Sequence, residues 1–156
     1  MKYILFLDID GCVNSDKWYN KTKGLKGDFD PEVIELLNTL KDDNVEVVVS
    51  SSWGEDGVKQ LKIVGLILPV IGYTEHFYQD WICRGNEIEK WLHDTFGGMC
   101  TKYGPNYIDK NYNYVIVDDD SDMLLGQKDN FVQINRETGI TKKDIQKIKN
   151  ILYGTK

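Results

Sequence analysis

The segment Tyr3-Ile4-Leu5-Phe6-Leu7-Asp8-Ile9-Asp10-Gly11 decides how the rest of the chain is interpreted. Its first five residues are apolar and predict a buried strand, and two carboxylates stand one residue apart at the end of that strand. Unpaired buried anions are costly, so a metal cation, or a phosphoryl group together with one, would explain both acids. Asp and Gly are also common at an ordinary strand-to-turn junction, so the segment alone leaves both interpretations open.

Further short runs of apolar and β-branched residues predict the remaining strands. Several of these runs are apolar throughout rather than alternating, which is typical of strands that helices cover on both faces of a parallel sheet. The predicted strands are residues 3–8, Val45–Val49, Leu66–Ile71, Tyr114–Val117 and Phe131–Ile134.

Helical patterns alternate with these strands. One helix is predicted to start at Asp30-Pro31-Glu32, which supplies a capping side chain and a proline at the first helical position. Two more are predicted over 55–64 and 86–96. The last follows Thr141, where Thr141 and Asp144 resemble a capping box. The alternation predicts a single three-layer α/β domain over residues 1–156.

Composition and charge exclude several classes of protein. With 41% hydrophobic and 28% charged residues, the chain is predicted to be globular rather than disordered. Its formal charge of −6 argues against a broad nucleic-acid-coating surface, although a local basic patch stays open.

Location is inferred from the apolar runs and the cysteines. The apolar runs are shorter than the ~20 residues that span a bilayer, and residues 3–7 are too short for a signal-peptide core. Cys12, Cys83 and Cys100 lack metal-site spacing and are odd in number, so neither a zinc site nor a disulfide framework is expected. We therefore expect a cytoplasmic protein with no membrane partner.

Three further features are expected at the carboxyl edge of the predicted sheet, which is where parallel sheets of this kind bind ligands. Two of them follow strands, and one precedes a helix. Residues 50–53, Ser-Ser-Ser-Trp, follow the second strand, residues 118–120 are three aspartates after the fourth, and Arg84 precedes the helix at 86–96. Taken singly, these features are typical of a helix cap, a solvated turn and a surface arginine. Together they provide the nucleophile, metal ligands, hydroxyl donor and positive charge that phosphoryl transfer requires.

The order of these features resembles the four motifs of the haloacid dehalogenase (HAD) superfamily, over nearly the whole chain. The motifs are Asp8-x-Asp10-Gly11, a hydroxyl after the second strand, Arg84 before a helix, and Asp118-Asp119. More narrowly, three local patterns resemble the HAD phosphatase domains of RNA-repair (polynucleotide 3′-phosphatase-like) proteins. They are Ser-Ser-Trp at 51–53, Arg84-Gly85-Asn86-Glu87-Ile88 with Trp91-Leu92, and Thr138-Gly139-Ile140-Thr141.

The resemblance implies a Rossmann-like HAD fold with a mainly parallel five-stranded sheet, and a Mg²⁺-dependent phosphatase. Segments 12–29 and 54–83, where members with large caps insert them, leave little room for a cap domain. Asp8 would be the nucleophile that forms an aspartyl-phosphate, and Asp10 would protonate the leaving oxygen and later deprotonate water. Mg²⁺ would be held by Asp8, the backbone carbonyl of Asp10, and Asp118 or Asp119.

The phosphoryl oxygens would be held by a hydroxyl and a guanidinium group. Strand length favours Ser50 as the hydroxyl donor, whereas the family's spacing to the tryptophan favours Ser51. Arg84 stands where many members have Lys, and its planar fork can hold two phosphate oxygens. Asp122 is a candidate for orienting Arg84 or the metal ligands, in competition with Asp119 and Asp120.

An uncapped site favours a large substrate, such as a nucleic-acid end. The segment after Gly11 also combines lysines for phosphates with aromatic rings for base stacking, and as it leaves the first strand it should overhang Asp8. The alternative is a flexible, solvated lysine loop. A second aromatic–basic stretch, residues 102–112, enters a strand and should lie at the opposite pole. The predicted substrate-binding residues are Gly11, Trp18, Tyr19, Lys21, Lys23 and Trp53, with Lys17 and Lys26 nearby.

The leading hypothesis is a phosphomonoesterase that acts on nucleic-acid or nucleotide phosphate ends. A small-metabolite phosphatase of the same fold and a non-catalytic phosphate-binding or interaction module are the alternatives. A signalling receiver domain is disfavoured because residues 135–137 are Asn-Arg-Glu, where a lysine would be needed.

Overall fold

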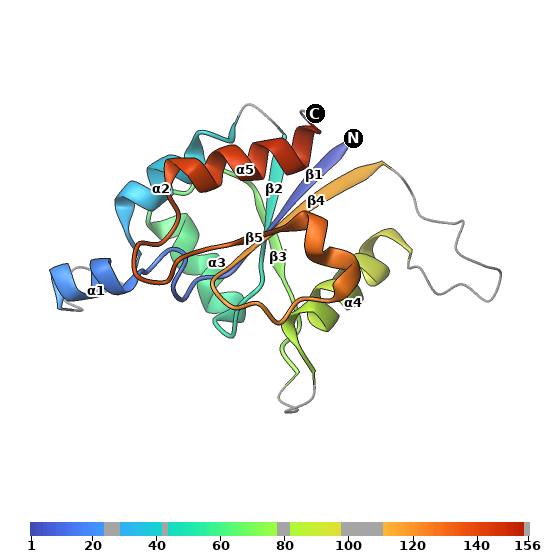
Figure 1. The fold of residues 1–156 in the computed structure, drawn as a ribbon, viewed down its shortest axis with the longest axis horizontal. Helices are drawn as coiled ribbons and strands as arrows, with labels where there is room; N and C mark the ends of the chain where they lie inside the picture. Colours follow the sequence, from blue (N-terminus) through green and yellow to red (C-terminus); the bar gives the residue numbers. More distant parts are fainter. Residues whose placement is uncertain (24–28, 42–43, 78–81, 98–110, 155–156) are drawn as a thin grey trace.

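The structure, a computed structural model, describes residues 1–23, 29–41, 44–77, 82–97 and 111–154. Within these ranges five parallel strands form one sheet, in the order β3-β2-β1-β4-β5 (Figure 1). Because β1 lies in the middle, the acidic segment that follows it leaves the sheet at the centre of its carboxyl edge. The strands are β1 (Lys2–Leu7), β2 (Val45–Val49), β3 (Val70–Tyr73), β4 (Tyr112–Asp118) and β5 (Phe131–Gln133).

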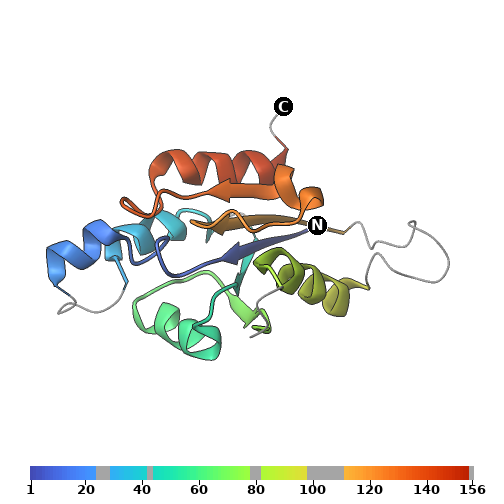
Figure 2. The same cartoon turned by 60° about the horizontal axis from the view of Figure 1, so that its bottom comes forward.

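Helices cover both faces of the sheet. Leu5 and Val47 point into a core that α2 (Pro31–Asn38), α3 (Gly54–Ile63) and α5 (Lys142–Tyr153) share. Phe6 points to the other face, which α4 (Arg84–Phe96) covers. Figure 2 shows α5 on one side of the strands and α4 on the other. The structure also contains α1 (Asp16–Thr22) and the short 3-10 helix η2 (Leu125–Asn130).

This arrangement confirms the predicted fold class. The sheet is parallel, helices lie on both of its faces, and no large cap domain lies among the described residues. The predicted helix starts are confirmed too. Asp30 accepts a hydrogen bond from the Glu32 backbone N–H at 2.9 Å, and Thr141 and Asp144 form the capping box of α5.

The third strand lies later in the chain than predicted. It was placed at Leu66–Ile71 but is found at Val70–Tyr73. Pro69 has no N–H for a sheet ladder, so pairing with β2 begins at its carbonyl, which accepts from the Val47 N–H at 2.8 Å. The apolar residues before it, Leu66 and Leu68, are buried in the connection instead.

Helix α1 differs from the sequence prediction, which treats this lysine-rich segment as a loop leaving the first strand. Ser15 caps the helix by accepting from the Trp18 N–H at 3.2 Å, and Asp16 lies favourably in the first turn. Trp18 is 8% exposed, so burial of its ring supplies the packing that holds a short helix of this kind. Figure 1 shows α1 at one end of the molecule.

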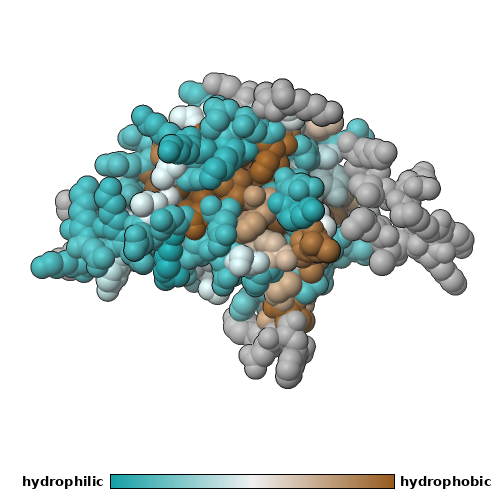
Figure 3. Space-filling view, viewed as in Figure 1, coloured by the Kyte–Doolittle hydropathy of each residue, from teal (hydrophilic) through white to brown (hydrophobic). Residues whose placement is uncertain are grey.

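Other expectations concern location and surface. None of the helices in the described ranges has the length and apolar character needed to cross a membrane. Figure 3 shows hydrophilic residues over α1 and α5 on the face it presents. Cys12 and Cys83 are free thiols. Lys26, Cys100 and most of the stretch 102–112 lie outside the described residues, while Tyr112 at the start of β4 stacks on Phe96.

Candidate active site

Four polar residues form a row across the carboxyl edge of the sheet. The register pairs Leu7 with Val117 and with Val49, and Val49 with Tyr73, so the residue after each of these four lies in one row. Backbone hydrogen bonds of 2.8–2.9 Å continue the ladder through three of the row's members. The row consists of Asp118, Asp8, Ser50 and Thr74, with exposed fractions of 3%, 6%, 1% and 1%.

Two of these residues are carboxylic acids on adjacent strands. Burial raises the pKa of Asp8 to about 7, and the Arg84 charge opposes that shift. Burial also raises the pKa of Asp118 to about 8, and the neighbouring Asp8 charge adds to this shift. Two acids that resist ionisation side by side gain most from a cation, which would restore both negative charges.

A third carboxylate, Asp119, completes an acidic cluster. One oxygen of Asp8, one oxygen of Asp119 and the Cys12 sulfur all lie within 4.8 Å of one another. Burial, followed by the Asp8 charge, raises the pKa of the Cys12 thiol well above its usual value. Cys12 is therefore a neutral neighbour, and the carboxylate oxygens are the ligands that suit a hard cation such as Mg²⁺.

Gly11 makes room for Asp119. Its φ of +77° favours glycine, and a Cβ at this position would collide with the Asp119 carboxylate. Gly11 was predicted as a substrate-binding residue; the structure gives it a role in packing the turn against the acidic cluster.

Arg84 is the first residue of α4 and points toward the acid pair. Its Nε lies 3.8 Å from Asp118 Oδ2, and its charge lowers the pKa of both Asp8 and Asp118. The Arg84 backbone N–H donates to Asp122 Oδ2 at 2.8 Å. Asp122, a candidate for orienting Arg84, therefore contacts the backbone of that residue rather than its guanidinium.

The guanidinium is held by Glu87, which was not singled out as a functional residue. Arg84 Nη1 donates to Glu87 Oε2 at 3.0 Å, and Glu87 is only 2% exposed. The second oxygen, Oε1, accepts from the Phe77 N–H and contacts His76 Nδ1, both at 2.9 Å. The signal in the sequence was an acid three residues after Arg84, one helical turn along the same face.

Asp10 is held by two side-chain donors. Asn14 Nδ2 donates to its Oδ1 at 2.7 Å, and Trp53 Nε1 donates to its Oδ2 at 3.1 Å. The indole N–H of Trp53 thus contacts the expected general acid, and the contact of Trp53 with substrate stays a prediction. Asn14, not predicted, also accepts from the Gly11 N–H at 3.0 Å and so fixes the turn.

The two candidate serines differ in their surroundings. Both are 1% exposed. A side-chain hydrogen bond from Ser51 lowers the pKa of Asp8, which places Ser51 beside the expected nucleophile. The hydroxyl of Ser50 has no hydrogen-bond partner among the described residues. Both hydroxyls thus stay candidates for contact with a phosphoryl oxygen.

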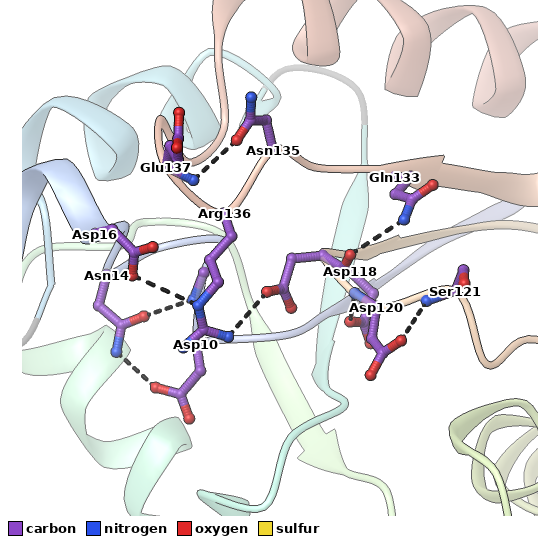
Figure 4. Close-up of polar contacts among 12 residues, drawn as sticks. Asp10, Asn14, Asp16, Asp118, Asp120, Ser121, Gln133, Asn135, Arg136 and Glu137 are labelled. Atoms are coloured by element: carbon purple, nitrogen blue, oxygen red, sulfur yellow. Dashed lines mark hydrogen bonds and ion pairs between the residues drawn. The ribbon is translucent and has the colours of Figure 1, made fainter.

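Arg136 closes one side of the acidic cluster. Its Nη1 lies 3.2 Å from Asp119 Oδ2, and its Nε lies 3.5 Å from Asp16 Oδ1. Figure 4 shows Arg136 between Asp16 and the aspartates at the end of β4. The Asp16 N–H donates to the Arg136 carbonyl at 3.1 Å, so the loop before α5 is hydrogen-bonded to the start of α1.

The predicted base-stacking side chains are only partly available. Trp18 is buried at 8% exposure, so its ring packs inside the molecule instead of facing solvent. Tyr19 is 64% exposed, Lys23 is exposed, and Lys21 Nζ lies 5.8 Å from the Trp18 ring centre. Lys17, Trp18 and Lys21 line a cavity of about 350 Å³ shared with α2 and the loop before α5.

Comparison with known protein families identifies the family of this chain. A family model described as the HAD domain in Swiss Army Knife RNA repair proteins matches residues 4–145. Neither the curated proteins nor the solved structures contain a match to this chain. The matched range includes the whole row of polar residues, Arg84, and the loop that carries Arg136.

Proposed function

The chain belongs to the family of HAD domains in Swiss Army Knife RNA repair proteins, and from this we propose that it is a Mg²⁺-dependent phosphomonoesterase acting on nucleic-acid or nucleotide phosphate ends. The observation that supports the proposal most is the pairing of Asp8 and Asp118 at adjacent strand ends, with Arg84 near both. This is an arrangement for bringing a phosphoryl group to a carboxylate nucleophile.

The protein's own residues divide the chemistry between them. The Asp8 carboxylate attacks phosphorus to form an aspartyl-phosphate, while Arg84 and the serine hydroxyls contact the phosphoryl oxygens. Asp10 protonates the leaving oxygen and then takes a proton from the water that hydrolyses the intermediate. Its two donors, Asn14 and Trp53, hold it in one orientation.

The residues of the acidic cluster fit a divalent cation. Asp8, Asp118 and Asp119, with the backbone carbonyl of Asp10, would hold it, and the oxygen donors match the preference of Mg²⁺. When bound, the cation supplies positive charge that offsets the three carboxylates and the phosphoryl oxygens. We also propose a cytoplasmic location, because the three cysteines do not indicate the disulfide framework typical of secreted proteins.

Phosphate release from a 3′-phosphorylated RNA oligonucleotide, with and without Mg²⁺, tests the proposal. We expect turnover that EDTA abolishes. Asp8→Asn should lower turnover by about a thousandfold or more, with the far-UV circular dichroism spectrum unchanged. Full turnover by Asp8→Asn, or none by the wild type on any phosphomonoester, would reject the mechanism.

A small-metabolite phosphatase is the second candidate, because only part of the predicted basic–aromatic segment is exposed. Replacing Trp18 would damage packing, so the discriminating variant is Tyr19→Ala with Lys21→Ala. It should weaken oligonucleotide hydrolysis about tenfold if Tyr19 stacks on a base, and it should not affect a small-metabolite enzyme. A non-catalytic binding module would retain phosphate binding and show no turnover.

A further inference from the structure

A second pocket adjoins the proposed catalytic edge, at the end of β3. Its volume is about 530 Å³, within the range of small-molecule sites. Ser52 follows Ser51 directly, and Thr74 lies level with Ser50 in the sheet. The pocket thus continues from the proposed phosphate position along the sheet edge. It is lined by Ser52, Gly54, Tyr73, Thr74, Glu75 and His76.

Two buried hydroxyls, those of Ser50 and Thr74, lie at the sheet edge between the acid pair and this pocket. Ser50 and Thr74 are each 1% exposed, and neither Ser50 Oγ nor Thr74 Oγ1 has a hydrogen-bond partner among the described residues. Burying a hydroxyl without a partner is unfavourable, so each of these groups calls for a partner that the described residues do not supply. Two neighbouring strands carry such a hydroxyl at the same level of the sheet.

The charge of the pocket indicates what it can hold. Among the described residues, its lining contains one carboxylate, Glu75, and no lysine or arginine. Glu75 is itself paired with Lys90 at 3.3 Å. A second phosphate would meet no lysine or arginine among these described lining residues, and the nearby Lys90 is already paired with Glu75. An uncharged group with hydroxyls would instead meet several polar side chains.

Tyr73 gives the pocket an aromatic wall. Tyr73 is 45% exposed, and Gly54, which lies beside the ring, carries no side chain to cover it. A Cβ on Gly54 would lie 3.7 Å from Tyr73 Cδ2 and would cover part of the ring. An exposed aromatic face of this kind can stack on a nucleobase.

The opposite side of the acidic cluster is closed by Arg136, which pairs with Asp119 and Asp16. On the β3 side, His76 lines the pocket and contacts Glu87, which in turn holds Arg84. The pocket wall is therefore connected to the residue expected to bind phosphate.

We propose that the pocket binds the nucleoside that carries the phosphate, with its base against Tyr73 and a sugar oxygen bonded to Thr74. This inference rests on the proposed phosphatase function. It adds that the nucleoside, which is the leaving group, lies on the β3 side of the acid pair.

Selectivity between two substrates tests the role of the ring. We compare kcat/KM for adenosine 3′-monophosphate with kcat/KM for glycerol phosphate, which has no base. In Tyr73→Ala this ratio should fall about tenfold, and Tyr73→Phe should restore it, because stacking needs only the ring. Ile71→Ala, an equally exposed β3 residue outside the lining, should keep the wild-type ratio. An unchanged ratio in Tyr73→Ala would overturn the proposal.

Thr74→Val separates ligand contact from structural damage. Replacing an unpartnered buried hydroxyl by a methyl group should leave the urea midpoint unchanged or higher. The KM for adenosine 3′-monophosphate should nevertheless rise severalfold. A KM equal to that of the wild type would exclude the contact with Thr74.

Binding of adenosine, measured by an NMR titration, needs neither metal nor turnover. Weaker binding by Tyr73→Ala than by Ile71→Ala would support the pocket even if no phosphomonoester were hydrolysed, and only the proposed function would then fail. Equal binding by both variants, beside normal phosphatase activity of the wild type, would reject the pocket and leave the function standing.

Discussion

Glu87 is 2% exposed, and its two carboxyl oxygens contact a guanidinium, an imidazole nitrogen and a backbone N–H. A buried carboxyl with this many partners fixes their positions relative to one another. The group it fixes nearest the acid pair is the Arg84 guanidinium. We infer that Glu87 positions Arg84 without touching substrate itself.

Glu87→Gln should therefore impair phosphate binding. The amide keeps an oxygen for the Phe77 N–H but loses the charge that holds Arg84, so kcat/KM should fall about ten- to a hundredfold. The inhibition constant of inorganic phosphate should rise in parallel, which a purely structural defect would not produce. Glu55→Gln, an exposed acid on α3, is the matched control and should behave as the wild type. Unaltered phosphate inhibition in Glu87→Gln would contradict the inference.

The acid pair makes stability depend on pH. Burial raises the pKa of Asp8 and Asp118 from 3.8 to about 7 and 8, so the metal-free folded protein holds protons that the unfolded chain releases. The contribution of these groups to stability is fully present below the unfolded pKa of 3.8. It is lost as the pH rises through 7 and 8.

Asp118→Asn removes one of the two buried acids whose ionisation makes the free energy of unfolding depend on pH. In EDTA, the variant should gain stability relative to the wild type between pH 6 and pH 9, by on the order of 2 kcal/mol, because only the wild type must ionise Asp118 in addition to Asp8 over this range. Urea denaturation at both pH values measures the difference. A difference between variant and wild type that does not change with pH would show that Asp118 is already ionised at pH 6.

At the scale of elements, the start of α4 is fixed by a close approach to η2. A Cβ on Gly85 would lie 2.5 Å from the Leu124 backbone nitrogen and 2.6 Å from Gln127 Oε1. Gln127 also donates to the Gly85 carbonyl at 2.9 Å. The position of Arg84, the first residue of α4, thus depends on a glycine beside it.

Gly85→Ala should push α4 away from η2. We expect a loss of about 1–3 kcal/mol in the free energy of unfolding and a lower kcat/KM, since Arg84 moves with the helix. Gly126→Ala, where nothing lies within 4 Å of the added Cβ, should change stability by about 0.5 kcal/mol at most. Urea denaturation and phosphate release measure both; equal behaviour of the two variants would refute the packing argument.

The elements that the sequence predicted correctly carry strong local signals. Helices α2 and α5 begin at capping residues that can be recognised in the sequence, and β1 and β2 are largely apolar runs. Helix α1 is stabilised mainly by the burial of Trp18, and β3 begins only where Pro69 allows pairing with β2. Both depend on neighbours distant in sequence, so local patterns missed α1 and placed β3 too early in the chain.

At the scale of the whole molecule, the strand order β3-β2-β1-β4-β5 brings residues 8, 50, 74 and 118 to one edge. The resulting row holds two acids that repel each other, with Asp119 close by. The folded protein should therefore bind a divalent cation that the unfolded chain binds poorly.

Mg²⁺ should stabilise the metal-free protein at pH 8. At a concentration about a hundred times its Kd, the free energy of unfolding should rise by roughly 2.7 kcal/mol. Thermal denaturation with EDTA, MgCl₂ or KCl at matched ionic strength measures the effect. Asp118→Asn should reduce it, and an equal rise with KCl would mean that screening, not a site, is responsible.

The α/β class, the acids at the end of the first strand and the motif order that indicates phosphoryl transfer could all be predicted from the sequence, because each is expressed in short local patterns and their order along the chain. The partners of those residues could be seen only in the folded chain: Glu87 for Arg84, Trp53 for Asp10 and Arg136 for Asp119. The same is true of the burial of Trp18. It also placed Thr74 level with Ser50. The physical reason is that burial and hydrogen-bond partners are set by strand register and helix packing, which join segments that no local pattern links.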